Sequence, residues 1–570
     1  MAKIKKIFAL IKNVVLTVYS TIKNNNTLAF LAIFLFFFSV FAFVYMNVPT
    51  VSSGDDHYFH FRFAEKLLND GFLNSFYNFK SIYFTKIAQG GEHFIYYNFL
   101  FYIVLLPFTY ITPLFVAIKL YAVFIIALIG AMLYMFIKKI GIKYPFLCSV
   151  LFFTIMGTVS LSRMFLSRPY VFGPVFLLLL ILVLYKKKYN WACWITFFYL
   201  FWHTATFFVP LIIGLVYFVI YALYNKKYEQ KILVCTFGGT LLALVIVNFI
   251  DNGFFTYIYD NILSVIKGIV TGNKVNISEG TELYKRNLFD FFSQNLILTI
   301  LFIASVVFNF FMYFNERRAF DLLTDKVKQK RILAMVLFFT ASIFFLAISN
   351  VSYRFADFFI FFGWAFVIVV FSEVLSFVQI TNMTIKKSLA SVVLISVVFL
   401  FANNLLQLND NFSESNRPES FARVGEYLSK NLKEDEIVFN VSWSWFPQLY
   451  YYAPKQNYVI GLEPKLTYLY DQKTYWFWFN ISRGFVCEIE ECKNQINEFI
   501  RISKKPELLK VWYKIQGDEM ARIITNNFQS HYIVSSINYE SLNEILDNNK
   551  HFVKVVNDEI YGYLVYKVLD

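Results

Sequence analysis

Long apolar runs separated by short basic clusters are the feature that most limits what this chain can fold into. A helix that spans a bilayer needs about 20 largely apolar residues. Lipid offers no hydrogen-bond partners to backbone N–H and C=O groups, so such runs are expected to be helices. Runs of this length or somewhat shorter lie at 27–46, 95–113, 115–137, 145–161, 170–185, 190–204, 205–224, 231–250, 296–314, 330–349, 355–377 and 386–404.

Composition agrees with a membrane environment. The chain has 570 residues, of which 58% are hydrophobic and 16% charged, whereas soluble domains carry about 45–50% apolar and about 25% charged residues. The formal net charge is +14, but the Lys and Arg residues gather between the apolar runs, as they do in cytoplasmic loops of membrane proteins. We therefore predict a polytopic α-helical membrane protein and no nucleic-acid partner.

The basic clusters also predict the orientation of the chain. Residues 1–26 are basic and amphipathic and contain no signal-peptide cleavage site, so we expect them to lie in the cytoplasm. If the run 95–113 spans the membrane, most basic clusters fall outside; if it is re-entrant or lies at the surface, every cluster falls inside. We adopt the second threading, with about 11 to 13 spans in a plasma (inner) membrane.

This threading also predicts the domains. Composition becomes polar near Asn403, and strand-like segments (EIVFNV, NYVIGL, HYIVSS, FVKVVND and YGYLVYKVL) then alternate with helical ones, which predicts a small α/β domain. Cys487 and Cys492 in this domain are candidates for a local disulfide. The expected order is a cytoplasmic N-terminus at 1–26, a transmembrane domain at 27–404 with large external loops 47–114 and 251–295, a linker at 405–417, and an extracytoplasmic domain at 418–570.

The first external loop holds the strongest candidates for chemistry. Asp55 and Asp56 follow the first apolar run closely, and adjacent carboxylates at a membrane surface are costly unless they are solvated, paired or metal-bound. From His57 onward the apolar residues have helical spacing, so one interpretation is that an aspartate only caps an amphipathic helix. The other is that the acids act as a base or bind a divalent cation, since Mg²⁺ and Mn²⁺ favour carboxylate oxygens.

The residues after Asp55 resemble a known family. The segment DHYFHFR, from Asp56 to Arg62, resembles the first-loop motif D-P-Y-(F/Y)-(N/H)-(Y/L)-R of the catalytic subunits of oligosaccharyltransferases and their bacterial relatives. These enzymes belong to the GT-C class of membrane glycosyltransferases, whose first external loop supplies an acid that binds a metal and contacts the acceptor. The resemblance implies this role for Asp56, with Asp55 beside it, and a divalent metal (Mg or Mn) as cofactor.

Three external arginines are candidates for binding the phosphate of a donor, because a guanidinium can bind phosphate with two hydrogen bonds. Arg163 and Arg168 lie in SRMFLSRP, which resembles a basic turn of the same enzymes. Arg354 opens an apolar run at its external end, against the helix dipole, and resembles the arginine with which GT-C enzymes hold the donor phosphate. Simpler interpretations are snorkelling of the first two and an Arg354–Asp357 pair for the third.

Further acids in the external loops are also candidates. Glu92 and His93 precede the run 95–113 and are either additional metal ligands or an ordinary polar flank. Glu279 and Glu282 resemble the loop glutamate that, in oligosaccharyltransferases, lies in a mobile segment closing over the acceptor. This implies an acceptor-binding role for the first and a catalytic role for the second. The alternative is that both are solvated loop acids.

Two tryptophans of the C-terminal domain are candidates for binding an acceptor. Trp443 and Trp445 lie in SWSWF, in the region where oligosaccharyltransferases carry W-W-D-Y-G for acceptor recognition. This chain lacks the aspartate of that motif, which argues against recognition of an N-linked sequon. A buried aromatic pair is the alternative. His203, at an external turn, is interpreted as a satisfied structural histidine.

Three functions are compatible with these features. The first is a GT-C glycosyltransferase that moves a sugar or oligosaccharide from a polyprenyl-phosphate or diphosphate donor to a polypeptide or glycan acceptor at the extracytoplasmic face. Metal-bound Asp56 would orient the acceptor, and Arg354 with Arg163 or Arg168 would hold the phosphate. The second is a transporter or flippase of a lipid-linked envelope precursor, which the scarcity of ionisable groups within the spans disfavours. The third is a non-catalytic envelope assembly protein.

Overall fold

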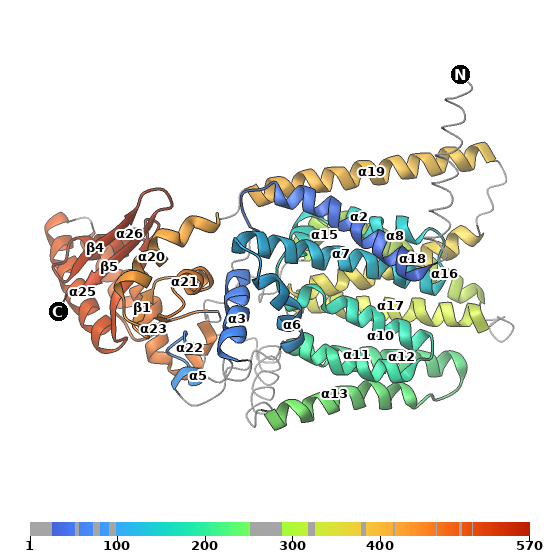
Figure 1. Cartoon of the computed structure of the whole chain (residues 1–570), viewed down its shortest axis with the longest axis horizontal. Coiled ribbons are helices and arrows are strands. Elements are labelled where there is room, and N and C mark those ends of the chain that lie inside the picture. Colours follow the sequence, from blue (N-terminus) through green and yellow to red (C-terminus); the bar gives the residue numbers. More distant parts are fainter. Residues whose placement is uncertain are drawn as a thin grey trace, which may run out of the picture.

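The computed structural model shows a bundle of long helices with a small α/β domain at one end (Figure 1). Most of the N-terminal segment, residues 1–24, lies outside the described residues, and so do the site candidates Asp55, Glu92, His93, Glu279 and Glu282. The described residues are 25–51, 56–71, 80–89, 98–250, 288–316, 325–350, 352–377, 383–413, 417–462, 464–489, 493–503 and 505–569.

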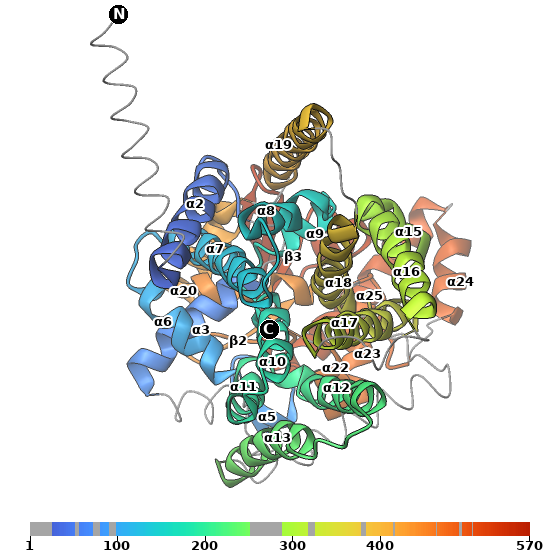
Figure 2. The ribbon, with the colours of Figure 1, turned by 90° about the vertical axis from the view of Figure 1, so that its right-hand side faces the viewer.

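The helices of the bundle form at the apolar runs of the sequence. Viewed from the end opposite the domain, α7, α10 and α18 lie inside the bundle, while α13 and α19 lie at its rim (Figure 2). The helices are α2 (Asn26–Met46), α6 (Phe99–Thr109), α7 (Leu114–Ile140), α8 (Pro145–Ile155), α9 (Thr158–Arg163), α10 (Gly173–Tyr185), α11 (Tyr189–Trp202), α12 (Val209–Asn225), α13 (Lys231–Ile250), α15 (Leu288–Gln294), α16 (Leu296–Glu316), α17 (Asp325–Asn350), α18 (Phe355–Phe377) and α19 (Met383–Ser413).

Fewer helices are long enough to span a membrane than the expected 11 to 13. Within the described residues, seven helices pass by length and composition, or eight if α15 and α16, which are bent by 102°, make one broken span. The difference arises because several apolar runs form shorter helices. In particular α6 has 11 residues and a length of about 16 Å, roughly half the thickness of the hydrocarbon core. It is therefore too short to cross alone, as the adopted threading requires.

The expected span 145–161 is divided into α8 and α9 at Gly157. Such a break leaves backbone groups without helical partners, and side chains from distant helices satisfy them. The Oδ1 atom of Asn295 accepts a hydrogen bond from the Gly157 N–H at 3.1 Å. A side chain at residue 157 would not fit, because its Cβ would lie 1.6 Å from the backbone oxygen of Gln294. Asn404 Nδ2 donates to three carbonyl oxygens at the end of α8, those of Phe153, Thr154 and Met156.

The C-terminal domain contains strands where the sequence predicts them. They form one sheet in the order β2-β1-β3-β5-β4, in which β1 is parallel to β2 and β3, and β5 is antiparallel to β3 and β4. The strands are β1 (Ile437–Asn440), β2 (Asn457–Tyr458), β3 (Ser530–Ser536), β4 (Phe552–Asp558) and β5 (Tyr563–Val568). The helices are α20 (Ala422–Asn431), α21 (Phe446–Tyr452), α22 (Pro464–Tyr470), α23 (Gln472–Ile481), α24 (Lys493–Ile502), α25 (Pro506–Asn526) and α26 (Glu540–Asp547).

Two details of this region differ from, or add to, the sequence prediction. The predicted linker 405–417 is helical over most of its length, because α19 continues to Ser413. Between Asn403 and Pro418 the sequence has neither glycine nor proline to end a helix, and Phe412 is buried with its ring 5.0 Å from that of Phe165. Cys487 is in a disulfide, and Cys492 lies outside the described residues.

Two described segments of the loop that was expected to be external, 56–71 and 80–89, contact the C-terminal domain. Ile82 pairs in parallel with Tyr458 of β2, and two backbone hydrogen bonds of 2.9 Å flank this bridge. The amphipathic helix that the sequence predicts is α3 (Asp56–Asp70). Its buried Phe59 packs against α21, with its ring 5.8 Å from that of Tyr450. The N-terminus of α3 therefore has a defined position between the bundle and the domain (Figure 1).

Gly157→Ala should destabilise the protein, because the new methyl group meets the backbone at Gln294 and not a side chain that can move. Overpacking of this kind typically costs about 1–3 kcal/mol. Gly238→Ala in α13 is the matched control, since a Cβ there has nothing within 4 Å. Thermal unfolding of the purified proteins in one detergent is the measurement. Equal midpoints for the two variants would contradict the close approach.

Candidate functional site

The site begins at the N-terminus of α3. Asp56 is the first residue of this helix, and its side chain is 34% exposed while the apolar face beyond it is buried. Its Oδ2 atom accepts from Arg168 Nη2 at 2.7 Å. Asp56 and Arg168, which the sequence analysis assigned to different ligands, thus form an ion pair.

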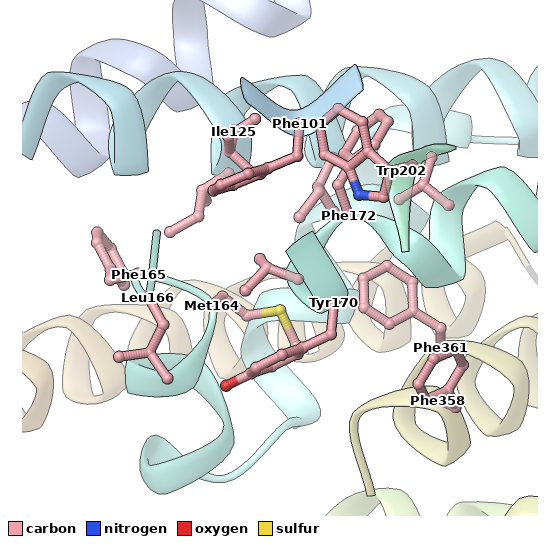
Figure 3. Packing of buried hydrophobic residues seen from close by; sticks show 14 of the residues in the cluster. Phe101, Ile125, Met164, Phe165, Leu166, Tyr170, Phe172, Trp202, Phe358 and Phe361 are labelled. Carbon is pink, nitrogen blue, oxygen red and sulfur yellow. The ribbon is translucent and has the colours of Figure 1, made fainter. Parts of the chain in front are cut away.

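Arg168 belongs to a turn that is held by packing. The turn runs from the end of α9 through the short helix η1 (Pro169–Val171), and Trp202 Nε1 donates to the Pro169 carbonyl at 2.5 Å. Figure 3 shows side chains of this segment packed among residues of α6, α7, α11 and α18, with Tyr170 in the cluster. The guanidinium of Arg168 lies 5.9 Å from the centroid of the Tyr170 ring.

Arg163 is paired with Asp357. Its Nε donates to Oδ1 at 3.2 Å and its Nη2 to Oδ2 at 2.9 Å, and both residues are buried. The guanidinium also lies 5.4 Å from the ring centroid of Tyr170 and 5.7 Å from that of Tyr353. Asp357, which the sequence suggested as a partner of Arg354, therefore pairs with Arg163 of another helix.

Arg354 lies close to His203. The ring of His203 lies 6.5 Å from that of Tyr170, and its Nδ1 hydrogen-bonds Thr206 Oγ1 at 2.7 Å. Burial, and secondly the Arg354 guanidinium, lower the pKa of His203 to about 3. His203 is thus a hydrogen-bonded structural residue, as interpreted from the sequence. His203 thus lies near both Tyr170 and Arg354.

We call the residues around this ring the Tyr170 cluster: Asp56, Arg163, Arg168, Tyr170, His203 and Arg354. They come from α3, the α9 turn, the α11–α12 turn and the start of α18. Among the described residues, the three guanidinium groups outnumber the two carboxylates that pair with them, those of Asp56 and of Asp357, so this part of the site carries excess positive charge. Such a site suits an anion with several oxygen atoms, and phosphate is the obvious class.

Two histidines of α3 border the cluster. His60 Nδ1 hydrogen-bonds the Tyr102 hydroxyl at 3.0 Å. His57 is 2% exposed, and within the described residues its Nε2 has no hydrogen-bond partner. Burial, with the Arg168 charge as the next cause, lowers the pKa of His57 to about 3. Burial also lowers the pKa of His60 to about 4. Both rings are therefore neutral near pH 7.

These contacts come from a fold that is also found in solved structures. No protein-family model and no curated protein matches the chain. The archaeal oligosaccharyltransferase AglB of Archaeoglobus fulgidus, solved with an inhibitory peptide and a dolichol-phosphate, matches with a TM-score of 0.54 and 12% identity over 94% of this chain and 74% of that chain. This chain has the GT-C fold. ArnT from Cupriavidus metallidurans, bound to undecaprenyl phosphate, matches over 95% of this chain and 97% of that chain, with a TM-score of 0.48 and 12% identity.

The GT-C fold of this chain offers part of a metal site among its described residues. Asp56 has the carboxylate oxygens that Mg²⁺ and Mn²⁺ prefer, and neutral His57 beside it has a buried ring nitrogen without a partner. Among the described residues no three His, Cys, Asp or Glu side chains come together as a metal site. The other expected ligands, Asp55, Glu92 and His93, lie outside the described residues. Asp56 and His57 thus supply at most two of the donors that a divalent cation needs, and a metal at this position stays a prediction.

The remaining candidates lie in the C-terminal domain. Trp443 and Trp445 form the short helix η6 just before α21 and are both partly buried. The ring of Trp445 lies 5.4 Å from that of Tyr563 and 5.8 Å from that of Phe421. Trp445 therefore packs as the buried-aromatic alternative describes, while any acceptor contact of Trp443 stays a prediction.

Sequence reasoning did not assign roles to Tyr170 and Tyr353. Both tyrosines lie next to the arginine pairs, and Tyr353 is held by a 2.7 Å hydrogen bond from its hydroxyl to Gln294 Oε1. The available signal was a tyrosine within two residues of an arginine, in SRPY (Arg168 and Tyr170) and in SYR (Tyr353 and Arg354). Aromatic rings stabilise guanidinium groups most when water is excluded, which a sequence does not show.

Asp357→Asn should strongly destabilise the protein, because it leaves the Arg163 charge buried without its carboxylate. Breaking such a pair from one side typically costs about 3–5 kcal/mol. Glu65→Gln is the control, since its ion pair with Arg62 is about one-third exposed and should be worth less than about 1 kcal/mol. Thermal unfolding of both variants tests this. A similar shift in the two midpoints would show that the buried pair is not needed for stability.

Acid should destabilise the fold through His57 and His60. Their pKa values in the folded state, about 3 and about 4, lie below the ordinary value of 6.5. The unfolded chain therefore binds more protons, and stability is lost as the pH falls from about 6.5 toward 4. The double variant His57→Gln/His60→Gln should show a flatter decline of the unfolding midpoint between pH 7 and pH 4. An unchanged slope would contradict neutral burial of the two rings.

Proposed function

We propose that this protein is a GT-C glycosyltransferase that moves a sugar or oligosaccharide from a polyprenyl-phosphate or diphosphate donor to an acceptor outside the cytoplasm. The observation that carries the proposal is the Tyr170 cluster, which brings Asp56, Arg168 and Arg354 together at the end of the bundle that faces the C-terminal domain. A lipid-linked phosphate entering from the bilayer would meet positive charge at this place. The solved relative by fold, AglB, was captured with a dolichol-phosphate and a peptide.

The three arginines are proposed to have different roles toward the donor. Arg163 is committed to Asp357, so we assign it a positioning role. Arg168 and Arg354 are then the residues that hold the phosphate. As the bond between the sugar carbon and the phosphate oxygen breaks, the electron pair stays on the phosphate, and fixed guanidinium groups stabilise this growing charge. The acceptor nucleophile forms the new bond to the same carbon and loses its proton.

Asp56 would act on the acceptor side. With a divalent cation bound, we propose Asp55, Glu92 and His93 as further ligands. The cation would supply Lewis-acid polarisation and orient the oxygen or nitrogen that attacks. Glu282, Glu279, Trp443 and Trp445 are proposed to contact the acceptor. This chain lacks the aspartate of W-W-D-Y-G, which argues against recognition of an N-linked sequon. The proposed acceptor class is therefore a polypeptide or a glycan.

The orientation of the chain supports transfer at the extracytoplasmic face. Lys138 and Lys139 end α7, and Lys186–Lys188 connect α10 to α11. The C-terminal end of α7 and the connection from α10 to α11 lie at the end of the bundle away from the C-terminal domain (Figure 1). Basic loops are retained in the cytoplasm, so we propose that the domain and the Tyr170 cluster lie on the outer side of a plasma membrane.

Asp56→Asn and Arg354→Gln should each lower sugar transfer about 100-fold or more, by analogy with the loss of other groups that stabilise charge in a transition state. The assay is transfer from a radiolabelled polyprenyl-linked sugar by the purified full chain. Asp70→Asn and Arg62→Gln are matched controls, since they remove the same charges elsewhere on α3. Both controls should retain transfer.

The outcomes separate the competing functions. Full transfer by Asp56→Asn and Arg354→Gln would contradict the catalytic assignment. Transfer that survives chelation of divalent cations would remove only the metal from the proposal. Movement of the intact lipid-linked sugar across liposomes without bond cleavage would instead support the flippase.

A further inference from the structure

Two ion pairs lie in or beside the Tyr170 cluster, and they differ in accessibility. In the pair Arg163–Asp357 the side chains are 10% and 2% exposed. In the pair Arg168–Asp56 they are 16% and 34% exposed. A carboxylate that keeps one-third of its surface is open to a second cation, whereas Asp357 is enclosed. The first pair is therefore enclosed by the fold, whereas the Asp56 carboxylate of the second pair remains accessible to another ligand.

The accessible pair joins two residues with different proposed ligands. Asp56 is the proposed ligand of a divalent cation, and Arg168 a proposed ligand of the donor phosphate. While Nη2 of Arg168 lies 2.7 Å from Oδ2 of Asp56, the pair satisfies both charges and each residue is partly withheld from its own ligand. A cation at Asp56 would repel the guanidinium, and a phosphate at Arg168 would draw it away from the carboxylate.

We propose that Arg168 exchanges between two anions: it neutralises Asp56 while no cation is bound, and it turns to the donor phosphate when a divalent cation takes the Asp56 carboxylate. The cation and the lipid-linked phosphate then bind with positive cooperativity. This inference rests on the proposed function and adds a coupling between its two ligands, since each ligand prepares the site for the other. By linkage the two ligands must strengthen each other by the same factor.

The surroundings of the pair favour this exchange. Tyr170 lies against both Arg163 and Arg168, at 5.4 Å and 5.9 Å. The Arg168 guanidinium can turn from one anion to the other while it stays in contact with the Tyr170 ring. A cation–π contact allows this because it is less directional than a bidentate ion pair.

The test is Mn²⁺ binding to the purified full chain, followed by electron paramagnetic resonance, with and without a polyprenyl phosphate. In the wild type the lipid phosphate should tighten Mn²⁺ binding by about 5-fold or more, the lower end of typical coupling between sites. Arg168→Gln should bind Mn²⁺ more tightly than the wild type in the absence of lipid, and the lipid should then have little further effect.

Control variants separate the exchange from a general effect of charge or folding. Arg62→Gln removes a positive charge from α3 that pairs with Glu65 and not with Asp56. The Mn²⁺ affinity and the coupling of this variant should equal those of the wild type. Arg168→Lys keeps the competing charge and loses the bidentate fork. It should bind Mn²⁺ as the wild type does and show weaker coupling. If Arg168→Gln does not fold, this variant still tests the exchange.

The results that would overturn the exchange differ from those that would overturn the function. Unchanged or weaker Mn²⁺ binding by Arg168→Gln, or equal coupling in Arg168→Lys and the wild type, contradicts the exchange even if sugar transfer is intact. Inorganic phosphate is the parallel arm: coupling by either form of phosphate supports the exchange, and the comparison tells whether the lipid tail is required. Absence of coupling with both forms contradicts it.

Discussion

The buried ion pair between Arg163 and Asp357 holds the parts of the candidate site together. It joins α9 to α18 across 194 residues of sequence, and the Tyr170 and Tyr353 rings lie on the Arg163 guanidinium. Two charges taken out of water are retained only with good geometry and further contacts, and this pair has two hydrogen bonds and two rings. Because Tyr170 and Tyr353 adjoin the turns that carry Arg168 and Arg354, one interaction positions both remaining arginines.

A second constraint comes from the break between α8 and α9. A continuous helix over 145–161 would carry Arg163 to a different depth and direction. The break is possible because two asparagines satisfy backbone groups that lipid would leave unpaired. Asn295 lies between α15 and α16, and Asn404 lies in α19. Asn295 and Asn404 thus help to place the turn that carries Arg163.

The C-terminal domain contributes position as well as surface. Residues of the first loop extend its sheet at Tyr458, and α21 packs on α3 through Phe59. A movement of the domain would therefore move the helix that begins with Asp56. Sequence reasoning predicted α3 and the strands separately, because apolar spacing is a local signal. It did not predict their contact, since nothing in the spacing of either segment names its partner.

Local patterns in the sequence were enough to predict the apolar helices, the amphipathic helix at Asp56 and the strands of the last domain. Hydropathy and periodicity are properties of neighbouring residues, so these features need no tertiary information. The tertiary structure decided that α19 runs through the expected linker, that Asp357 pairs with Arg163 rather than Arg354, and that Asp56 meets Arg168. Charge pairing depends on distance and exclusion of water, and both are set only when distant segments pack.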